Sequence, residues 1–474
     1  MAHAFHPSIL REYDIRGIVG DTLDEDDAYI LGRAFGACII RDGGASVCVG
    51  FDGRLTSPPL ADALMKGLAK CGLEVLNIGL GPTPMLYFAV HHLNAGGGIV
   101  VTGSHNPPEY NGFKLVLGKR PFFGRDIQML GKAARAGDFV SGAGKITAME
   151  IQDDYVKRLL AGFHEIVPGT FDLGIAWDPA NGAAAPVICD LVKHLPGKHI
   201  LLNETVDGTF PAHVPDPTVP EALEQLQQTV KKHGLDIGFS FDGDGDRVGA
   251  IDERGRIVWG DQILALLAES VLKDNPGATI IADVKSSDNL FKKIKAEGGV
   301  PLMWRTGHSL IKKKMIETGA LLAGEMSGHI FIADRYYGFD DAIFASLRVL
   351  GALVQGETSL KDWLDQQPET FNTPEIRFPC PEEEKFAAVE RLKKLLAESN
   401  LEVNDIDGVR VTAGNGWWLL RASNTQAVLV ARCEADSAHK LEEVKQHMQD
   451  WLDKAGIETA PKQAIPKQDI TGTA

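Results

Sequence analysis

The sequence predicts an α/β protein of several domains, in which three related α/β units precede one α+β unit. Three observations lead to this prediction. The chain has 474 residues, and single hydrophobic cores stop growing at about 250–300 residues. One strand–helix–strand pattern occurs three times along the first three quarters of the chain. The remaining part departs from that pattern, so we expect four domains rather than one.

Each copy of the pattern begins with an apolar run that ends in aspartate, continues with a helical segment and closes with a second apolar run. Strand, helix and strand at this spacing are typical of a βαβ unit. We therefore expect three α/β domains with mixed sheets. The initial runs end at Asp52, Asp178 and Asp283, and the expected helices span 58–71, 183–194 and 288–297.

The C-terminal part reads differently. An amphipathic helix is expected over 383–399, short strands follow between 407 and 435, and a second helix is expected over 438–454. Separate helices and strands indicate α+β structure. The end of the chain is rich in Pro, Lys, Gln and Thr, which predicts a flexible tail. The predicted domain limits are 1–149, 150–252, 253–367 and 368–460, with the tail at 461–474.

Composition excludes several classes of protein. The net charge of −16 disfavours nucleic-acid binding, because phosphate contacts need a basic face. No apolar stretch approaches the roughly 20 residues that cross a bilayer, and the N-terminus lacks the features of a signal peptide. The six cysteines are scattered, which fits a reducing compartment. We therefore expect a cytoplasmic protein without nucleic-acid or membrane partners.

The first candidate loop follows the apolar run at 96–101 and reads TGSHNPP. Small residues and two prolines predict a rigid, exposed turn that presents the hydroxyl of Ser104. The turn is either a plain surface turn or the support of a nucleophile. It is not a GxSxG elbow, so a hydrolase triad is disfavoured. Lys114, shortly downstream, is expected to neutralise a phosphate on Ser104.

The second loop is more specific, because Asp242, Asp244 and Asp246 alternate with glycines between two apolar runs. Clustered carboxylates repel one another and need a counter-cation, and oxygen ligands favour Mg²⁺ or Ca²⁺. An EF-hand is disfavoured, because its sixth position would be Arg247 instead of glycine and its flanks read as strands. A metal beside Arg247 suits stabilisation of a phosphoryl group in transfer.

Two further loops are weaker signals when each is taken alone. GEMSGH, at 324–329, carries hydrogen-bonding groups suited to sugar hydroxyls, and RASNT, at 421–425, resembles a phosphate cradle. Cationic side chains also stand near strand ends. Together they supply the local positive charge that an acidic chain needs for an anionic substrate. These cations are Arg16, Lys114, Arg247, Lys285, His308 and Arg421.

In this order, the four loops resemble those of the α-D-phosphohexomutase family, and most closely its bacterial phosphomannomutase/phosphoglucomutase branch. TGSHNPPEYNGFK resembles the active-site serine loop, DGDGDR the metal loop, GEMSGH the sugar loop and RASNT the phosphate loop. The resemblance covers nearly the whole chain. It implies four domains around a central cleft, of which the fourth is a TATA-binding-protein-like α+β domain, and each domain contributes one loop.

The resemblance also implies a reaction. Phosphoserine 104 would give its phosphoryl group to a hexose phosphate of mannose or glucose, and the 1,6-bisphosphate would return its other phosphate to Ser104. Glucose or mannose 1,6-bisphosphate would thus be both intermediate and activator. One Mg²⁺ per chain would be held by Asp242, Asp244, Asp246 and phosphoserine 104. The branch is expected to be monomeric, with hexose phosphates as its small-molecule partners.

Individual roles follow from the same resemblance. Ser104 carries the phosphate, and Arg247, Lys114, His105, Arg16 and His329 stabilise charge or relay protons. The general base stays open among Lys114, His105, Arg16 and His329. Glu325 and Ser327 would hold sugar hydroxyls. The substrate phosphate would bind Arg421, Ser423, Asn424 and Thr425, with Lys285 and His308 nearby, and Tyr13 is also assigned to substrate binding.

Two alternatives remain at this point. A phosphoglucosamine mutase would have a GEQSGH loop, and Met326 argues against it, as does the SNTQ sequence at 423–426. A sugar-phosphate-binding protein without catalysis is the second alternative. The intact Ser104 and the three loop aspartates argue against that one.

Overall fold

The computed structural model describes residues 2–167, 169–424 and 426–458. Thr425 and the tail predicted at 461–474 lie outside the described residues. The chain divides into two compact units, Met1–Gln367 and Pro368–Ala474, here called the first and second unit. The described residues of the first unit form three β-sheets, and those of the second unit form one.

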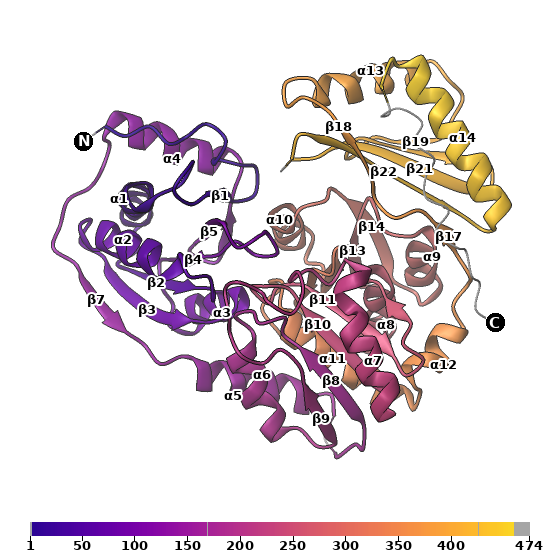
Figure 1. Cartoon of the computed structure of the whole chain (residues 1–474), viewed down its shortest axis with the longest axis horizontal. Helices are drawn as coiled ribbons and strands as arrows, with labels where there is room; N and C mark the ends of the chain where they lie inside the picture. The colour runs from indigo at the N-terminus through magenta and orange to yellow at the C-terminus, as the bar shows by residue number, and fades with distance from the viewer. Residues whose placement is uncertain (1, 168, 425, 459–474) are drawn as a thin grey trace. The chain divides into compact units, whose positions relative to one another are not determined.

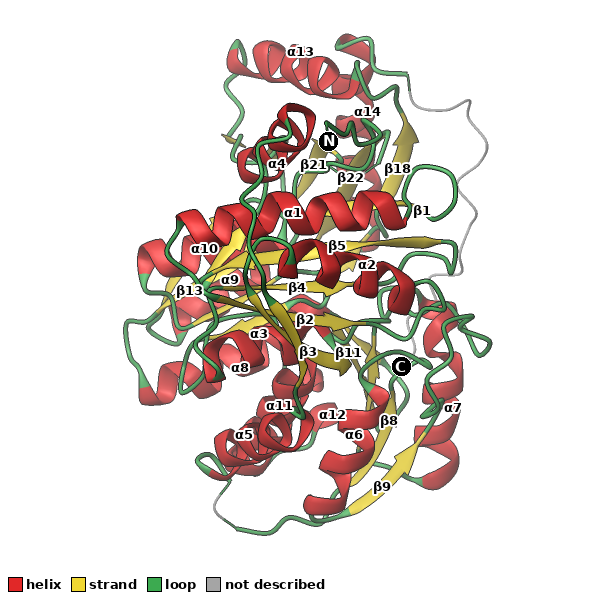
Figure 2. Ribbon diagram, turned by 90° about the vertical axis from the view of Figure 1, so that its left-hand side faces the viewer, coloured by secondary structure: helices red, strands yellow, loops and turns green. Residues whose placement is uncertain are grey.

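The first sheet has the order β1-β5-β4-β2-β3-β7, with β6 paired to β5. β2 runs parallel to β3 and β4, whereas β5 is antiparallel to β4 and β1, so the sheet is mixed. Figure 2 shows β5, β4, β2 and β3 side by side. Its strands are β1 (Ile15–Ile18), β2 (Ser46–Phe51), β3 (Glu74–Leu80), β4 (Gly97–Val101), β5 (Tyr110–Leu117), β6 (Arg120–Phe122) and β7 (Lys145–Ala148).

Helices cover both faces of this sheet. Val47 and Val49 of β2 pack in one core with α1 (Glu25–Arg41), α2 (Ser57–Ala69) and α4 (Arg125–Ala136). Cys48, between the two valines, points to the opposite core, which contains α3 (Thr83–His92). This alternation is the period of two that places successive strand residues on opposite faces.

The second sheet has the order β12-β11-β10-β8-β9. β10 is parallel to β8 and antiparallel to β11, and β12 extends the sheet beyond Asp252. Helix α7 covers one face and α5 and α6 the other (Figure 1). The strands are β8 (Gly174–Asp178), β9 (Lys198–Leu201), β10 (Ile237–Phe241), β11 (Val248–Asp252) and β12 (Ile257–Val258), and the helices are α5 (Gln152–His164), α6 (Ala185–Leu191), η1 (Val192–His194), η2 (Pro220–Leu223) and α7 (Glu224–His233).

The third sheet has the order β14-β13-β15-β16 and is also mixed, since β13 is parallel to β14 and β15 while β15 and β16 are antiparallel. Helix α10 packs on one face, and α8 and α9 pack on the other. The strands are β13 (Thr279–Asp283), β14 (Val300–Trp304), β15 (Leu322–Gly324) and β16 (Ile330–Ile332), and the helices are α8 (Gly260–Asp274), α9 (Asp288–Ala296), α10 (His308–Thr318), α11 (Ala342–Gly356) and α12 (Leu360–Asp365).

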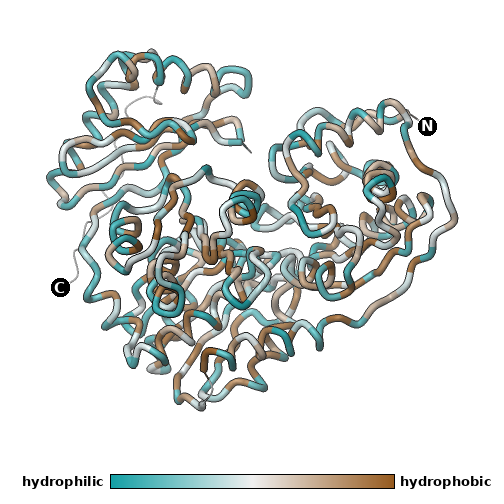
Figure 3. Tube along the Cα trace, turned by 180° about the vertical axis from the view of Figure 1, so that it is seen from behind, coloured by the Kyte–Doolittle hydropathy of each residue, from teal (hydrophilic) through white to brown (hydrophobic). Residues whose placement is uncertain are grey.

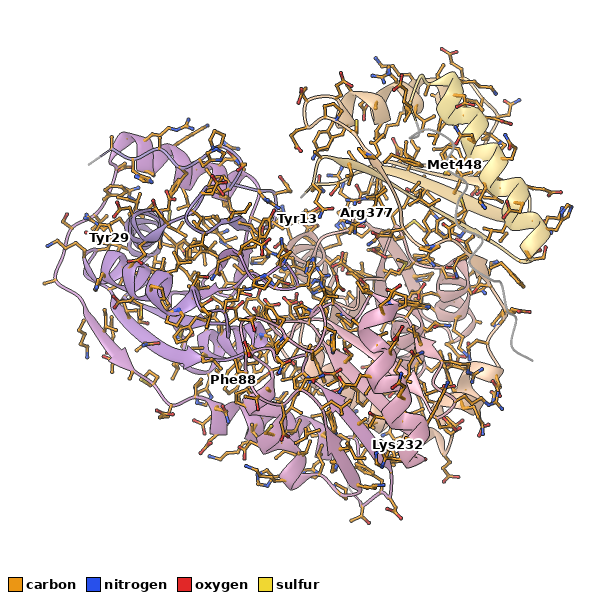
Figure 4. The ribbon with its side chains drawn as sticks, in the orientation of Figure 1. Tyr13, Tyr29, Phe88, Lys232, Arg377 and Met448 are labelled. Atoms are coloured by element: carbon orange, nitrogen blue, oxygen red, sulfur yellow. The ribbon has the colours of Figure 1, made fainter. Side chains whose placement is uncertain are left out.

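One continuous core joins the three sheets of the first unit. It contains side chains from α3, from β8 and β10, and from α8 and α11. Phe88 of α3, labelled in Figure 4, contacts Tyr155 of α5, with 5.4 Å between ring centroids. The hydrophobic stretches drawn brown in Figure 3 include these buried strands. Because the interior is closely packed, the loops at the ends of these strands hold fixed positions relative to one another.

The second unit is an antiparallel sheet of order β17-β22-β21-β20-β19, with β18 paired to β22. Helices α13 and α14 share a core with the sheet face that carries Val409, Trp418 and Leu420. This is the α+β structure that the sequence predicted. The elements are β17 (Phe371–Asn372), β18 (Ile376–Pro379), α13 (Lys385–Ala397), β19 (Val403–Asn404), β20 (Val409–Ala413), β21 (Gly416–Ala422), β22 (Val428–Ala435) and α14 (Ala438–Lys454).

The three predicted strand–helix–strand copies are confirmed as β2-α2-β3, β8-α6-β9 and β13-α9-β14. In each copy the two strands pair in parallel, as a βαβ unit requires. Within the described residues, no helix is long and apolar enough to cross a membrane.

Candidate active site

The serine loop connects β4 to β5 and carries Ser104 in a left-handed backbone conformation, with φ +50°. The sequence predicted an exposed turn, and this prediction is wrong, because Ser104 is only 2% exposed. The metal loop packs over it. A Cβ atom at Gly243 would lie 2.5 Å from the carbonyl oxygen of Ser104, so this approach requires glycine.

Two buried residues that sequence reasoning missed hold the serine loop from beneath. The guanidinium of Arg54 donates hydrogen bonds to the carbonyl oxygens of Ser104, Asn106, Pro107 and Tyr110, at 2.8, 2.6, 2.6 and 3.2 Å. It also pairs with Asp52, whose Oδ2 accepts from the Gly103 N–H at 3.0 Å. Both residues follow β2 directly. In the sequence, two opposite charges just after a predicted buried strand could have indicated this pair.

The metal loop connects β10 to β11, the strand flanks that the sequence predicted. Oδ1 of Asp242 accepts from the backbone N–H groups of Asp246 and Arg247, both at 3.1 Å, which closes the loop. Oδ2 of Asp242 accepts from the hydroxyl of Ser104 at 3.0 Å. The serine and metal loops are therefore in direct contact, although the two residues are 138 positions apart.

The three loop aspartates form a buried cluster whose carboxylate oxygens lie within 4.8 Å of one another. Lys114 donates to Oδ2 of Asp244 at 2.7 Å and to Oδ2 of Asp246, and Thr83, another residue that the sequence did not reveal, donates to Asp244 at 2.5 Å. Among the described residues, Oδ1 of Asp244 and Oδ1 of Asp246 have no hydrogen-bond partner. Buried, unsatisfied carboxylate oxygens in such a group fit a hard divalent cation.

Electrostatics support this fit. Burial, together with the charges of Asp244 and Asp246, raises the pKa of Asp242 well above its usual range. Burial alone would lower the pKa of Lys114, but the neighbouring carboxylates outweigh it and raise that pKa. Lys114 also holds the pKa of Asp244 below its usual range despite burial. One lysine thus faces three carboxylates, and a divalent cation would balance the remaining negative charge.

Further cationic groups surround Ser104. Arg16 donates to the carbonyl oxygen of Gly103 at 2.9 Å and to the side chain of Asn106 at 2.6 Å, and Asp14 binds its other nitrogen. Nδ1 of His105 lies 3.2 Å from Oγ of Ser104. Burial and the nearby guanidinium groups lower the pKa of His105, so its ring is neutral at neutral pH.

The sugar loop connects β15 to β16 and lies against the metal loop. The N–H of Val248 donates to the carbonyl of Gly328 at 3.0 Å, and Nε of Arg247 donates to Nε2 of His329 at 3.0 Å. Nδ1 of the same ring lies 3.1 Å from Oδ2 of Asp340. Sequence reasoning did not single out Asp340.

The predicted sugar ligands differ in their surroundings. Glu325 is buried, and its Oε1 accepts from the N–H of Gly307 at 2.7 Å. Burial raises the pKa of Glu325. Ser327, two residues further on, is half-buried. The two side chains lie in the predicted loop between β15 and β16.

The other substrate candidates of the first unit surround α10. His308 begins that helix, and its ring stacks on His329 with 5.5 Å between centroids. The hydroxyl of Tyr13, labelled in Figure 4, donates to the carbonyl of Thr306 at 2.7 Å, and its ring lies 6.3 Å from that of His308. Lys285 is buried, with its ammonium 3.9 Å from Asp283.

The phosphate loop lies in the second unit, between β21 and β22. Arg421 is buried, and its Nε donates to Asp407 at 2.9 Å. The N–H of Ser423 donates to the carbonyl of Val428 at 3.0 Å, and its hydroxyl accepts from the N–H of Gln426 at 3.2 Å. Asn424 is half-buried. Thr425, the fourth residue predicted here, lies outside the described residues.

The first unit thus brings together the predicted residues of the serine, metal and sugar loops, and the fourth loop stands within its own domain. Four family models match the chain in order: the α/β/α domains I, II and III of phosphoglucomutase/phosphomannomutase over residues 7–135, 153–255 and 259–371, and its C-terminal domain over 375–450. The chain belongs to the phosphoglucomutase/phosphomannomutase family. The predicted family and its four-domain fold class are confirmed.

Individual members of the phosphoglucomutase/phosphomannomutase family are similar along the whole chain. The phosphomannomutase/phosphoglucomutase of Pseudomonas putida is 46% identical over 94% of this chain and 96% of its own length. The protein of the same name from Pseudomonas aeruginosa is 44% identical over 92% and 94%. A crystal structure of a family protein from Burkholderia thailandensis matches with a TM-score of 0.89 and 40% identity, covering 96% and 99% of the two chains. These matches confirm the prediction that the protein is an enzyme, a hexose phosphate mutase.

Proposed function

We propose that this chain interconverts the 1-phosphates and 6-phosphates of mannose, glucose or both, by way of phosphoserine 104 and a hexose 1,6-bisphosphate. The observation that carries the proposal is the contact between Ser104 and the aspartate cluster. The serine hydroxyl lies 3.0 Å from Oδ2 of Asp242, and Arg16, Lys114 and Arg247 donate hydrogen bonds within the serine, metal and sugar loops. A phosphate on this hydroxyl would meet a site arranged for negative charge.

One Mg²⁺ would complete the site. Asp242, Asp244 and Asp246 would hold it together with an oxygen of phosphoserine 104, and the unsatisfied Oδ1 atoms of Asp244 and Asp246 support this assignment. When bound, the ion would neutralise charge on the phosphoryl group during transfer.

Side chains of this protein would bind the substrate, stabilise charge and transfer protons during the reaction. In the first transfer, the bond between phosphorus and Oγ of Ser104 breaks and a bond forms between phosphorus and the free sugar hydroxyl. The hydroxyl proton passes to a base, and Oγ of Ser104 gains a proton. Return of the other phosphate reverses these changes. Arg16, Lys114 and Arg247 would stabilise charge in both transfers, because their positions are fixed by hydrogen bonds.

The proton carrier belongs to the set of His105, Lys114, Arg16 and His329. Nδ1 of His105 lies 3.2 Å from Oγ of Ser104. Nε2 of His329 accepts from Nε of Arg247, and its Nδ1 lies 3.1 Å from Oδ2 of Asp340. Imidazole rings at these positions suit general acid–base catalysis.

Substrate recognition would divide between the two units. Glu325 and Ser327 would bind the sugar hydroxyls that remain equivalent in both orientations of the sugar. Arg421, Ser423, Asn424 and Thr425 would bind the phosphate that does not react, and Lys285, His308 and Tyr13 are also proposed as substrate ligands. The buried guanidinium of Arg421 supports this role, since it is a bidentate donor suited to phosphate.

Intact-mass spectrometry and coupled assays test the proposal. After incubation with glucose 1,6-bisphosphate, the wild type should gain one phosphate, and Ser104→Ala should gain none. Ser104→Ala should also abolish turnover while glucose 1-phosphate still binds in calorimetry. Assays with mannose, glucose and glucosamine 1-phosphates separate the remaining alternatives. Dominant glucosamine activity would replace the proposal by a phosphoglucosamine mutase, and a wild type that is never phosphorylated would favour a binding protein.

Several further points are proposals on the same basis. We propose a monomer in the cytoplasm with hexose phosphates as partners, without nucleic-acid partners. We also propose the domain limits 1–149, 150–258, 259–367 and 368–460, in which the second domain is extended to include β12 because this strand pairs with β11.

A further inference from the structure

A cavity of about 210 Å³ lies in the first unit, and none of its lining residues belongs to the four loops. It is bounded by α3 and the β5–β6 turn of the first domain, and by α10 and the segments 319–321 and 333–339 of the third. Its lining is mainly apolar and includes Val90, Val116, Met315 and Leu321. Such a lining does not suit a hexose phosphate, whose hydroxyls would lose hydrogen bonds to water.

One side of the cavity is an aromatic wall. The rings of Tyr337 and Phe339 stack at 5.5 Å with an angle of 7° between their planes, and His91 lies 4.7 Å from Tyr337. Together these three side chains give this wall an aromatic lining that can contact another ring. A cavity of 150 Å³ is already large enough for benzene, so this one suits a ligand of one or two fused rings.

The polar groups of the cavity are cationic or neutral. Lys119, in the turn between β5 and β6, is exposed and forms no ion pair with any described residue. Lys312 also lines the cavity and donates to Asp340 at 2.8 Å and to the hydroxyl of Tyr87 at 3.2 Å. Burial, with a smaller effect of Lys119, lowers the pKa of His91 to about 4, so this ring is neutral at neutral pH. The unpaired charge at the cavity is therefore positive.

We propose that this cavity is a second ligand site, which binds a small aromatic compound with one anionic group. The rings would lie against Tyr337 and Phe339, and the anionic group would meet Lys119. The occupant would contact the first and third domains together. Its chemistry differs from that of a sugar phosphate, so the two ligands should occupy separate sites.

Calorimetric titration of the full-length protein with 2-naphthoate tests this proposal, with 2-naphthalenemethanol as the uncharged probe of similar shape. One molecule of naphthoate should bind per chain, and saturating glucose 1-phosphate should leave its Kd unchanged. Competition between the two would mean that naphthoate occupies the sugar-phosphate site and would overturn the proposal, as would the absence of naphthoate binding.

Two variants locate the bound probe. Ala333→Phe fills part of the cavity, because Ala333 is half-buried in its lining, and should abolish binding of both probes. Lys119→Ala should weaken naphthoate about 2- to 5-fold, the usual effect of an exposed ion pair, without changing naphthalenemethanol. Neither residue belongs to the proposed active site, so mutase activity serves as the control for folding. Unchanged naphthoate binding in a folded Ala333→Phe variant would refute the assignment, and if that variant does not fold, an equal Kd for wild type and Lys119→Ala would do so.

Discussion

Replacing Arg54 with methionine tests whether the serine loop depends on the buried charge beneath it. Arg54 is 1% exposed, and its guanidinium donates to four carbonyl oxygens of the loop as well as to Asp52. Methionine has a similar length and fills much of the same space. The substitution therefore removes the charge and the donors while leaving most of the packing.

The size of the destabilisation depends on the hydrogen bonds that Asp52 keeps after the substitution. Removing one partner of a buried ion pair typically destabilises a protein by about 3–5 kcal/mol. Asp52 would keep its hydrogen bonds from Ser57 at 2.5 Å, from Thr102 at 2.9 Å and from the Gly103 N–H at 3.0 Å. These donors stabilise the remaining carboxylate, so we expect the lower end of the range, about 3 kcal/mol.

The exposed pair between Arg41 and Asp138 offers a matched control, because these side chains are 49% and 55% exposed. Arg41→Met should cost no more than about 1 kcal/mol. Urea unfolding of the full chain measures both variants against the wild type. Arg54→Met should also lower kcat, because Ser104 loses the support of its carbonyl oxygen. Equal destabilisation by the two variants would refute the reasoning, because it would mean that a buried ion pair contributes no more to stability than an exposed one.

Three further predictions concern other parts of the first unit. Thr83→Val removes the hydrogen bond to an aspartate of the metal loop and should raise the Mg²⁺ concentration for half-maximal activity about 10- to 100-fold. Asp340→Asn should lower kcat for the mutase reaction with little change in KM, because it removes the charge that faces His329. Burial alone would lower the pKa of His213, but the hydrogen bond and charge of Asp178 outweigh it and raise that pKa. The stability from this pair is thus full below about pH 6.5, the usual unfolded value, and is lost as the pH rises through the higher folded value. The difference in urea midpoint between wild type and His213→Gln should therefore be larger at pH 6 than at pH 8.

Each of these predictions has a contrary outcome. An unchanged Mg²⁺ requirement in Thr83→Val would mean that this hydroxyl does not orient the metal loop. A higher KM with unchanged kcat in Asp340→Asn would assign that residue to substrate binding. A difference for His213→Gln that grows with pH would show that the pair does not favour the protonated ring.

Local sequence patterns were sufficient to predict the repeated units of the fold. In β2-α2-β3 and its two counterparts, the period of the apolar residues and the position of proline at the start of α2 are properties of adjacent residues. The metal loop was predictable for the same reason, because its three carboxylates alternate within five positions. The packing of the three sheets around one core could not be predicted, since it depends on contacts between distant segments.

Several residues of the site could not be predicted from the sequence for the same reason. Ser104 reads as an exposed turn residue because its local sequence contains only turn formers, but in the structure it is buried and contacts the metal loop, 138 positions away. Thr83 contacts a carboxylate 161 positions away. Asp340 is one of many buried aspartates, and its position beside His329 became visible only in three dimensions. Contacts between domains carry no local periodicity that a single sequence reveals.

The acidic composition of the chain and its anionic substrate are compatible because the cations of the site are oriented before the substrate arrives. Lys114 is held by Asp244 and Asp246, Arg16 by Asp14 and the serine loop, and Arg247 donates to His329. At physiological ionic strength, charges beyond about 8 Å are largely screened. The net charge of −16 therefore weakens long-range attraction of a hexose phosphate but has little influence inside the site. There, fixed and partly buried cations act at short range. Because folding has already oriented them, little free energy is needed to rearrange them when the substrate binds.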